Sequence, residues 1–429
     1  MLNRLKSFYI NTNNIERSSY VWNTASGLLF AMQSAILLMV ISRTNSLDDA
    51  GVFSIAYAVA SLMYYVGEFG VRKYQITDVL EKASFCDYHT HRVVTCIIVI
   101  IASLIYAGSG FITGKYNQDK ALVILLVCFM KALEAYSDVF FSRFQQQGRL
   151  DVAAKTNTFR IVESMICCII SLIITRNLLI SMVVWLVTAV IGLLISSILV
   201  APDYGKIEFH LIKEKFILIT RECMPLFLGN FLLLYVGNAP KYAIDEFMDD
   251  KAQACFNFIF MPVFVIGLLA NFIFNPILVE LAKEWEKSNY KKFRTIIIRQ
   301  MFVIAGLTVL AIAVAQTIGI PVLGILFHAD LTGSKTSLTI LMLGGGMLAL
   351  ANFFTVTVTV VRGQKYLIPG YFLTAIAARL LSGYFVRTHG VLGASILYAF
   401  MMTLVSLAFG LVFVLCVKYK KEKKETAGN

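Results

Sequence analysis

The segment Ala201–Arg221, APDYGKIEFHLIKEKFILITR, is one of the few long polar interruptions in an otherwise apolar sequence. Phe209, Ile212, Phe216 and Ile219 recur at helical spacing, and charged residues occupy the other faces. This pattern predicts an amphipathic helix that lies along a membrane surface. Because the segment divides the chain into halves of about equal length, we expect it to link two domains.

The sequence on either side of this segment is too apolar for a soluble protein. Of the 429 residues, 58% are hydrophobic and 15% are charged, whereas charged residues make up about 25% of soluble domains. The composition therefore predicts an integral membrane protein. The net charge of +12 does not indicate nucleic-acid binding, because no polar domain is present to carry a basic face.

Twelve apolar segments are long enough to cross about 30 Å of hydrocarbon, which takes roughly 20 residues. They lie at 20–41, 50–69, 93–113, 121–141, 159–175, 178–200, 223–240, 252–281, 300–327, 337–361, 367–386 and 391–417. We predict an all-α integral membrane fold of twelve transmembrane helices in two pseudo-symmetric six-helix bundles. The expected parts are an N-terminal lobe (1–200), a cytoplasmic amphipathic linker (201–221), a C-terminal lobe (222–417) and a basic cytoplasmic tail (418–429).

The distribution of positive charge predicts the orientation. Of the 38 Lys and Arg residues, 28 fall on the side that both termini share, eight fall on the other side, and two, Lys131 and Arg379, lie inside helices. Positive residues favour the cytoplasm, so both termini are expected to be cytoplasmic. The chain is therefore expected to cross its membrane many times.

Short matches indicate that the two halves are repeats. Leu47-Asp48-Asp49 precedes the second predicted span, and Met248-Asp249-Asp250 precedes the eighth. Six spans in each half make the repeats parallel, as in some secondary transporters. Gly344–Gly346 lies near the middle of the tenth span and indicates either a hinge or close helix packing.

Three ionisable residues share one face of the fourth predicted span. Lys131, Glu134 and Asp138 occupy positions i, i+3 and i+7. Ionisable groups at membrane depth cost a few kcal/mol and usually face a bundle interior or a wet cavity. The two acids are candidates to bind a coupling proton or Na⁺, and Lys131 is a candidate to bind charged cargo. The alternative is a salt-bridge ladder that neutralises itself.

Arg379 in the eleventh predicted span has no acid within four residues along the chain. A guanidinium group can bind a phosphate oxygen pair with two parallel hydrogen bonds, so Arg379 is a candidate phosphate ligand. The competing interpretation pairs it with Glu134 or Asp138.

Three further cations end predicted spans. Arg43 and Lys241 end the first and seventh spans on the outer side, where they line the mouth of a cavity or anchor the helix at the interface. Arg72 ends the second span on the inner side and is a candidate contact for an anionic head group, with a solvated loop as the alternative. The motif CDYHTH (Cys86–His91) is not expected to bind a metal, because histidines at i and i+2 diverge on a helix.

Several segments resemble bacterial polysaccharide flippases of the Wzx type. They are SLDDAGVFSIAYAVASLMYYVGEFGVRKYQITDV (46–79), FCDYHTHR (85–92), QQQGRLDVAAK (145–155), NAPKYAIDEF (238–247) and FNFIFMPVFVIGLLANFIFNP (256–276). Drug-extruding MATE proteins share the fold of these flippases without these segments. The chain is thus identified as a member of the multidrug/oligosaccharidyl-lipid/polysaccharide exporter (MOP) superfamily.

The resemblance implies two six-helix lobes and a function in polysaccharide biosynthesis. The implied cargo is a polyprenyl-pyrophosphate-linked oligosaccharide, moved from the inner to the outer leaflet by alternating access. Cationic cavity residues in the family are thought to meet the pyrophosphate or acidic sugars, for which Lys131 and Arg379 are the candidates here. Other expected partners are membrane lipids and the polysaccharide polymerase and glycosyltransferases.

Two other functions compete with this one. The first is a cation-coupled multidrug antiporter of the MATE type. The second is a membrane enzyme of polysaccharide assembly, such as a polymerase, but this would need a large outer loop or a paired acid and base at a surface, and the sequence has neither. We therefore expect no enzyme activity and no cofactor apart from a coupling H⁺ or Na⁺.

Overall fold

The structure is a computed structural model that describes residues 2–78 and 81–427, without the side chains at 2–5, 268–276, 279 and 422–427. These residues form helices and connecting segments, with no β-strand among them. The chain divides into two compact units, Met1–Phe231 and Leu232–Asn429. The division falls inside one long helix, α9, so each unit contains part of it.

The first unit contains eight α-helices and the beginning of a ninth. They are α1 (Leu2–Ile10), α2 (Ile15–Thr44), α3 (Leu47–Glu68), α4 (Val71–Thr77), α5 (Phe85–Ile112), α6 (Gln118–Gln146), α7 (Leu150–Thr175), α8 (Leu178–Leu193) and α9 (Lys213–Phe247), with a π-helical turn at Leu194–Ile198 and a 3₁₀ turn at Ala201–Asp203.

Polar residues fix where these helices begin. Ser46 accepts a hydrogen bond from the Asp49 amide at the start of α3, and Asn117 accepts one from the Lys120 amide at the start of α6. Ser84 and Asp87 form a reciprocal capping box at the start of α5. Such caps satisfy amide groups that have no partner inside the helix.

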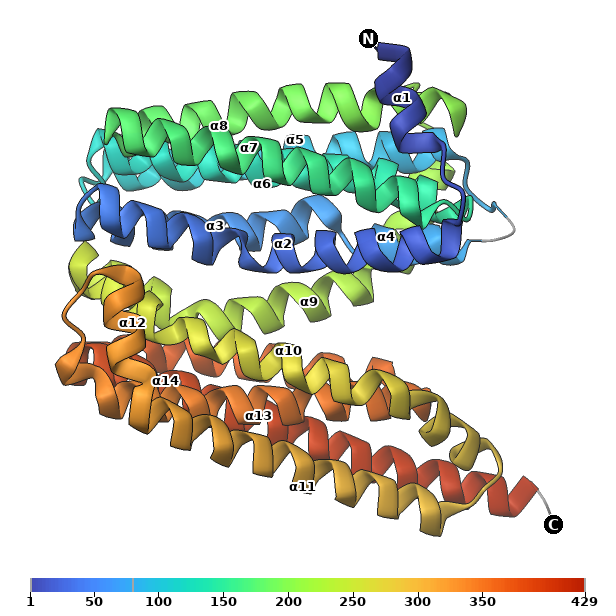
Figure 1. The fold of residues 1–429 in the computed structure, drawn as a ribbon. Helices are drawn as coiled ribbons and strands as arrows, with labels where there is room; N and C mark the ends of the chain where they lie inside the picture. The colour runs from blue at the N-terminus through green and yellow to red at the C-terminus, as the bar shows by residue number, and fades with distance from the viewer. Residues whose placement is uncertain (1, 79–80, 428–429) are drawn as a thin grey trace. The chain divides into compact units, whose positions relative to one another are not determined.

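Helix α6 lies at the centre of the first unit, where it packs against α3, α4, α5, α7 and α8 (Figure 1). Most of its side chains are buried, including Lys131, Glu134 and Asp138. By contrast, α5 exposes a row of isoleucine and leucine side chains such as Ile98, Ile101 and Ile105. In a membrane an apolar exposed face suits lipid and a central helix can carry charge, so the packing explains the placement of both.

The predicted amphipathic helix at 201–221 is wrong over most of its length. Only the last part is helical, as the start of α9 at Lys213, and 206–212 has no regular secondary structure. Side chains of α5 form hydrogen bonds with backbone groups of this segment, which in a helix would bond to one another. His89 Nδ1 lies 3.2 Å from the Glu208 carbonyl, and the His210 amide donates to Thr90 Oγ1 at 2.9 Å. Phe209 and Ile212 are consequently exposed.

The second unit contains the rest of α9 and five further α-helices. They are α10 (Asp250–Glu286), α11 (Tyr290–Val314), α12 (Ile320–Phe327), α13 (Lys335–Val360) and α14 (Ile368–Ala427), with a π-helical turn at Ala315–Gly319 and 3₁₀ turns at Thr332–Ser334 and Gln364–Leu367. Residues 418–427 of the predicted tail continue α14, and 428–429 lie outside the described residues.

The three glycines of α13 allow close packing of helices. A Cβ atom on Gly344 would lie 2.6 Å from the Tyr398 ring on α14, and one on Gly346 would lie 2.2 Å from Thr308 Oγ1 on α11. The described backbone around them is regular helix. Of the two interpretations of this motif, the contacts favour packing over a hinge.

Each of the twelve predicted spans corresponds to a helix of the structure. The last two lie in α14 on either side of Gly390, whose φ of 54° and ψ of −132° interrupt the helix. Within the described residues, nine segments are long and apolar enough to cross a membrane, and α14 is one of them. Helix α6 falls outside these nine; it is long enough but carries charge at its centre.

Candidate functional site

The charged face of α6 forms two separate ion-pair groups. In the first, the Lys131 ammonium donates to Glu134 Oε2 at 2.6 Å and to the Tyr57 hydroxyl of α3 at 2.9 Å. The same ammonium lies 4.5 Å from the centre of the Tyr57 ring and 5.0 Å from that of Phe30. Lys131 and Glu134 therefore neutralise each other, as the alternative interpretation of this face expected.

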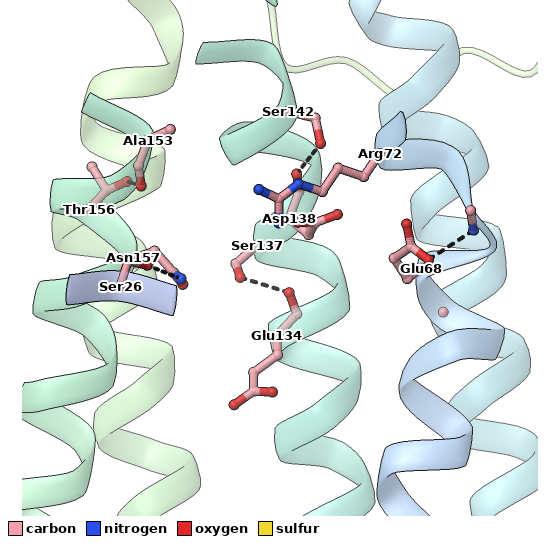
Figure 2. Close-up of polar contacts among 12 residues, drawn as sticks. Ser26, Glu68, Arg72, Glu134, Ser137, Asp138, Ser142, Ala153, Thr156 and Asn157 are labelled. Carbon is pink, nitrogen blue, oxygen red and sulfur yellow. Dashed lines mark hydrogen bonds and ion pairs between the residues drawn. The ribbon is translucent and has the colours of Figure 1, made fainter. Parts of the chain in front are cut away.

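The second group surrounds Asp138 and was not expected. Arg72 Nη1 of α4 donates to Asp138 Oδ1 at 3.1 Å, and Arg92 Nη2 of α5 lies 3.4 Å from Asp138 Oδ2. Figure 2 shows Arg72 reaching from α4 toward Asp138, while the Glu134 carboxylate points away from it. Arg72 also lies 4.0 Å above the Phe141 ring. The interpretation of Arg72 as part of a solvated loop is therefore wrong.

A break between α3 and α4 brings Arg72 to this position. Phe69 (φ 52°) and Gly70 (φ 71°) both adopt the left-handed conformation, which ends α3 and starts α4 in a new direction. The Gly67 carbonyl at the end of α3 accepts hydrogen bonds from Arg92 Nη1 at 2.7 Å and Thr95 Oγ1 at 2.8 Å. A fully buried arginine thus satisfies a backbone group near the break.

Carboxylates hold α4 at both ends. At its beginning, Glu68 Oε2 accepts from the Gly70 amide at 2.9 Å (Figure 2). At its end, Asp78 accepts from the Lys82 and Ala83 amides at 3.0 and 3.1 Å and from the Tyr88 hydroxyl at 2.8 Å. Burial alone raises the pKa of Asp78, but these hydrogen bonds outweigh it and leave the pKa below its ordinary value.

Residues of α2, α3, α4, α6 and α7 line a cavity of about 110 Å³ in the first unit. Asp138, Glu134 and Arg72 contribute to its wall, and α7 adds Arg160. The remaining lining residues are Asn23, Ser26, Gly27, Phe30, Tyr64, Ser137, Phe141, Thr156, Asn157 and Ser197. Most of these side chains carry hydroxyl, amide or charged groups, so the wall can hydrogen-bond a polar ligand.

Arg160 is the cation in this wall with hydrogen-bonding capacity to spare. Its side chain is buried, and Nη2 donates to Asn157 Oδ1 at 2.8 Å. Asn157 in turn donates to Ser26 Oγ at 2.8 Å (Figure 2). Nε and Nη1 of Arg160 have no hydrogen-bond partner among the described residues. A buried guanidinium with two unused donors suits an anionic or hydroxyl-rich ligand.

The charges of this region leave a positive excess. The cavity wall itself carries two cations, Arg72 and Arg160, and two carboxylates, Glu134 and Asp138. Lys131 and Arg92, which pair with these carboxylates, add two cations, and Glu68, which caps the start of α4, adds one carboxylate. With all seven ionised, one net positive charge remains. The site as a whole therefore favours an anionic group over a cationic one.

Arg379 and Lys241 belong to the second unit. Arg379 is 68% exposed, and its Nη1 lies 3.8 Å from Glu246 Oε2 of α9, so its acid partner is neither Glu134 nor Asp138. A surface cavity of about 510 Å³ contains this pair together with Arg387, which lies 4.1 Å above the Phe247 ring. Lys241 is buried, with its ammonium 4.6 Å from the centre of the Phe260 ring.

Arg43 and the histidine motif lie outside the charged cavity. Arg43 is exposed at the end of α2 and is absent from the cavity wall. His89 contacts the Tyr136 hydroxyl at 2.9 Å, and His91 contacts Thr220 Oγ1 of α9 at 3.1 Å. The described residues contain no group of metal-binding side chains. The motif instead joins α5 to the connecting segment and to α9.

Sequence reasoning missed Glu68, Arg92 and Arg160. All three lie within two residues of the ends of predicted spans, and the two arginines there resemble ordinary interfacial anchors. The structure extends α5 to Phe85 and α7 to Leu150, which places Arg92 and Arg160 inside helices. Asparagine and threonine close to Arg160, at Asn157 and Thr156, were the signal that its helix has a polar face.

Comparison with known proteins identifies similar families and folds. The family model described as "Polysaccharide biosynthesis protein" matches residues 17–282, which is more than half of the chain. No curated protein matches the sequence.

Several solved transporter structures are similar in fold. An inward-facing multidrug resistance MATE family transporter of the MOP superfamily has a TM-score of 0.72 at 10% identity, covering 93% of this chain and 96% of that one. A eukaryotic MATE transporter has a TM-score of 0.55 at 15% identity, covering 99% and 98%. A Vibrio cholerae MATE transporter has a TM-score of 0.56 at 11% identity, covering 94% and 98%. The chain therefore has the fold of MOP superfamily transporters.

Proposed function

Because the chain belongs to the polysaccharide biosynthesis protein family, we propose that it is a flippase for polyprenyl-pyrophosphate-linked oligosaccharides in a bacterial cytoplasmic membrane. Family membership and the MOP fold support a membrane transporter rather than an enzyme. The match to a polysaccharide family also favours this cargo over the drugs of a MATE antiporter.

The cavity of the first unit is the observation that carries the proposal. A pyrophosphate bears about two negative charges and cannot enter hydrocarbon without replacing its hydration. The unused donors of Arg160 and the net positive charge around it supply that replacement. Hydroxyl and amide groups such as Ser26, Ser137 and Asn157 suit the hydroxyl groups of a sugar.

The cavity is small for the whole cargo. At about 110 Å³ it holds a phosphate group or part of one sugar, and a larger space is expected in another state of the transport cycle. The lipid tail remains in the bilayer throughout, because moving it through a polar site would be costly. Alternating access then carries the polar head group from the inner to the outer leaflet.

Net movement needs an energy source. We propose coupling to an H⁺ or Na⁺ gradient through the buried carboxylates, with Glu134 and Asp138 as the candidates from sequence. In the cell, the polymerase and the glycosyltransferases of the same pathway are the expected partners.

The test is transport in proteoliposomes that contain a polyprenyl-pyrophosphate-linked oligosaccharide. A membrane-impermeant glycosidase added outside measures how much cargo becomes accessible with time. We expect Arg160→Ala to lower the rate at least tenfold and Arg160→Lys to recover part of it, because lysine keeps the charge but not the paired donors. Arg17→Ala, which removes an exposed cation at the start of α2, is the matched control.

Two results would reject the proposal. One is efflux of cationic dyes by the same proteoliposomes without movement of the lipid-linked sugar, which would indicate a drug antiporter. The other is equal transport of the lipid-linked sugar by Arg160→Ala and by the wild type, which would remove this cavity from the pathway.

A further inference from the structure

The break between α3 and α4 contains a buried carboxylate that differs from the others in the charged region. Glu134 is paired with Lys131, and Asp138 is paired with Arg72 and Arg92. Glu68 is also buried, but among the described residues it forms no ion pair. Its hydrogen-bond partners are backbone amides at the start of α4, those of Gly70 at 2.9 Å and Arg72.

Glu68 lies among ionisable groups from four other helices. Asp138 of α6 repels its ionised form, and Arg92 of α5 attracts it. Cys223 of α9 is close enough to interact with it electrostatically. Arg72 of α4 forms its ion pair with Asp138, at 3.1 Å. A buried carboxylate near a second carboxylate, with no cation of its own, is the arrangement in which a proton is most readily taken up.

We propose that Glu68 is the residue that takes up the coupling proton. A hydronium ion gives its proton to a Glu68 carboxylate oxygen and leaves as water, which removes one negative charge from beside Asp138. This inference rests on the proposed function for the need for a proton, and it adds a residue that the sequence pattern of α6 did not indicate.

Proton uptake at Glu68 changes the support of α4. The ionised carboxylate caps α4 through the Gly70 amide, and a neutral carboxyl group is a weaker acceptor. Because α4 carries Arg72, a looser cap also loosens the contact between Arg72 and Asp138 in the cavity wall. The proton therefore alters the wall that meets the cargo.

The break also contacts α9 directly. The Phe69 ring stacks on Phe227 with centres 4.5 Å apart and planes 12° apart. A Cβ atom on Gly70 would lie 2.8 Å from Leu226 Cβ, so only glycine allows this approach. The break therefore packs against the part of α9 that lies in the first unit.

Infrared difference spectroscopy between acidic and neutral pH tests the proposal without any cargo. The wild type in lipid is expected to show the carbonyl stretch of a protonated buried carboxyl group. Glu68→Gln should lose this band, and Glu163→Gln, which changes an exposed acid of α7, should keep it. Isotopic labelling of glutamate carboxyl groups in the wild type should shift the band, which assigns it to glutamate even where the variant fails to fold.

Hydrogen exchange supplies a second readout at one fixed pH. Glu68→Gln, which mimics the protonated state, should exchange the amides of 70–77 roughly tenfold faster than the wild type, the change expected when a charged acceptor becomes neutral. A band that survives in Glu68→Gln, or one that labelled glutamate leaves unshifted, overturns the proposal. So does exchange at 70–77 equal to that of the wild type. Neither readout depends on sugar transport, so a failed flipping assay leaves this test intact.

Discussion

Arg72 at the start of α4 and Asp138 in the last third of α6 form an ion pair of 3.1 Å across two helices of the first unit. Arg92 approaches the other oxygen of the same carboxylate at 3.4 Å. The pair joins residues 66 positions apart in the sequence. In the sequence the charged residues of α6 could pair with one another, but in the structure Asp138 pairs with residues of α4 and α5.

Removing the charge of Asp138 should destabilise the protein strongly. Asp138→Asn leaves Arg92, which is fully buried, without its carboxylate. Breaking a buried ion pair on one side costs about 3–5 kcal/mol. Thermal unfolding in detergent is the measurement. Asp203→Asn, which breaks the exposed pair between Lys6 and Asp203, is the control and should cost at most about 1 kcal/mol. Equal losses in the two variants would contradict this account.

The pair of Lys131 and Glu134 should behave as one unit. Glu134→Gln alone leaves a buried ammonium without its partner at 2.6 Å, and Lys131→Met alone leaves the carboxylate. Each single variant should lose stability by about 3–5 kcal/mol, and the double variant should lose less than the sum because neither charge remains. A thermal double-mutant cycle measures the difference. Additive losses would show that the two groups are independent.

The sequence predicted that these three charges would share a buried face, because the spacing of i, i+3 and i+7 and the cost of charge in a membrane are local properties. It could not predict their partners. Arg72 reaches Asp138 because the chain turns at Phe69 and Gly70 between α3 and α4, and left-handed residues in the sequence do not specify the direction of the next helix.

The helix predicted at 201–221 was also wrong because its tertiary partners cannot be read from the sequence. Helical spacing of Phe209, Ile212 and Phe216 is necessary for an amphipathic helix but does not exclude an extended segment that uses side chains of another helix as partners. Span boundaries failed for the same reason. Arg160 is the second residue of the predicted span 159–175 and was counted with the inner connection before it, whereas α7, which packs against α2 and α6, begins at Leu150.

Asp78 should make stability depend on pH at the acidic end. Its pKa is lowered in the folded protein, so its contribution is complete above the unfolded pKa of about 3.9 and is lost as the pH falls through the folded value. The stability difference between wild type and Asp78→Asn should therefore shrink below about pH 4. Unfolding midpoints from pH 7 to pH 3 measure it, with Asp119→Asn, an exposed acid of α6, as the control. A difference that stays constant with pH would argue against this role.

Close packing at Gly346 should tolerate no side chain. Gly346→Ala places a Cβ atom 2.2 Å from Thr308 Oγ1 and should cost about 1–3 kcal/mol. Thr308→Ala in the same chain removes the closest atoms and should recover part of the loss. Gly306→Ala on α11, where nothing lies within 4 Å, is the matched control and should be neutral or stabilising. Comparable unfolding temperatures for Gly346→Ala and Gly306→Ala would contradict the packing interpretation.

Arg379 remains a predicted phosphate ligand. Arg379→Ala should abolish flipping while the protein still inserts into the membrane, and Arg379→Lys should restore part of the rate. Glu246→Gln distinguishes cargo binding by Arg379 from its ion pair with Glu246, because it keeps Arg379 and removes the acid at 3.8 Å. Transport by Arg379→Ala at the wild-type rate would exclude a role in cargo binding.

The central position of α6 also bears on how the protein is made. A helix with a lysine and two acids near its middle is a poor substrate for insertion by itself, since each such residue costs about 2.5–3.5 kcal/mol at the centre of a bilayer. Lys131 and Glu134 lower that cost within α6, but the partners of Asp138 are on α4 and α5, which emerge from the ribosome first. We therefore expect stable insertion of α6 to depend on the helices that precede it in the chain.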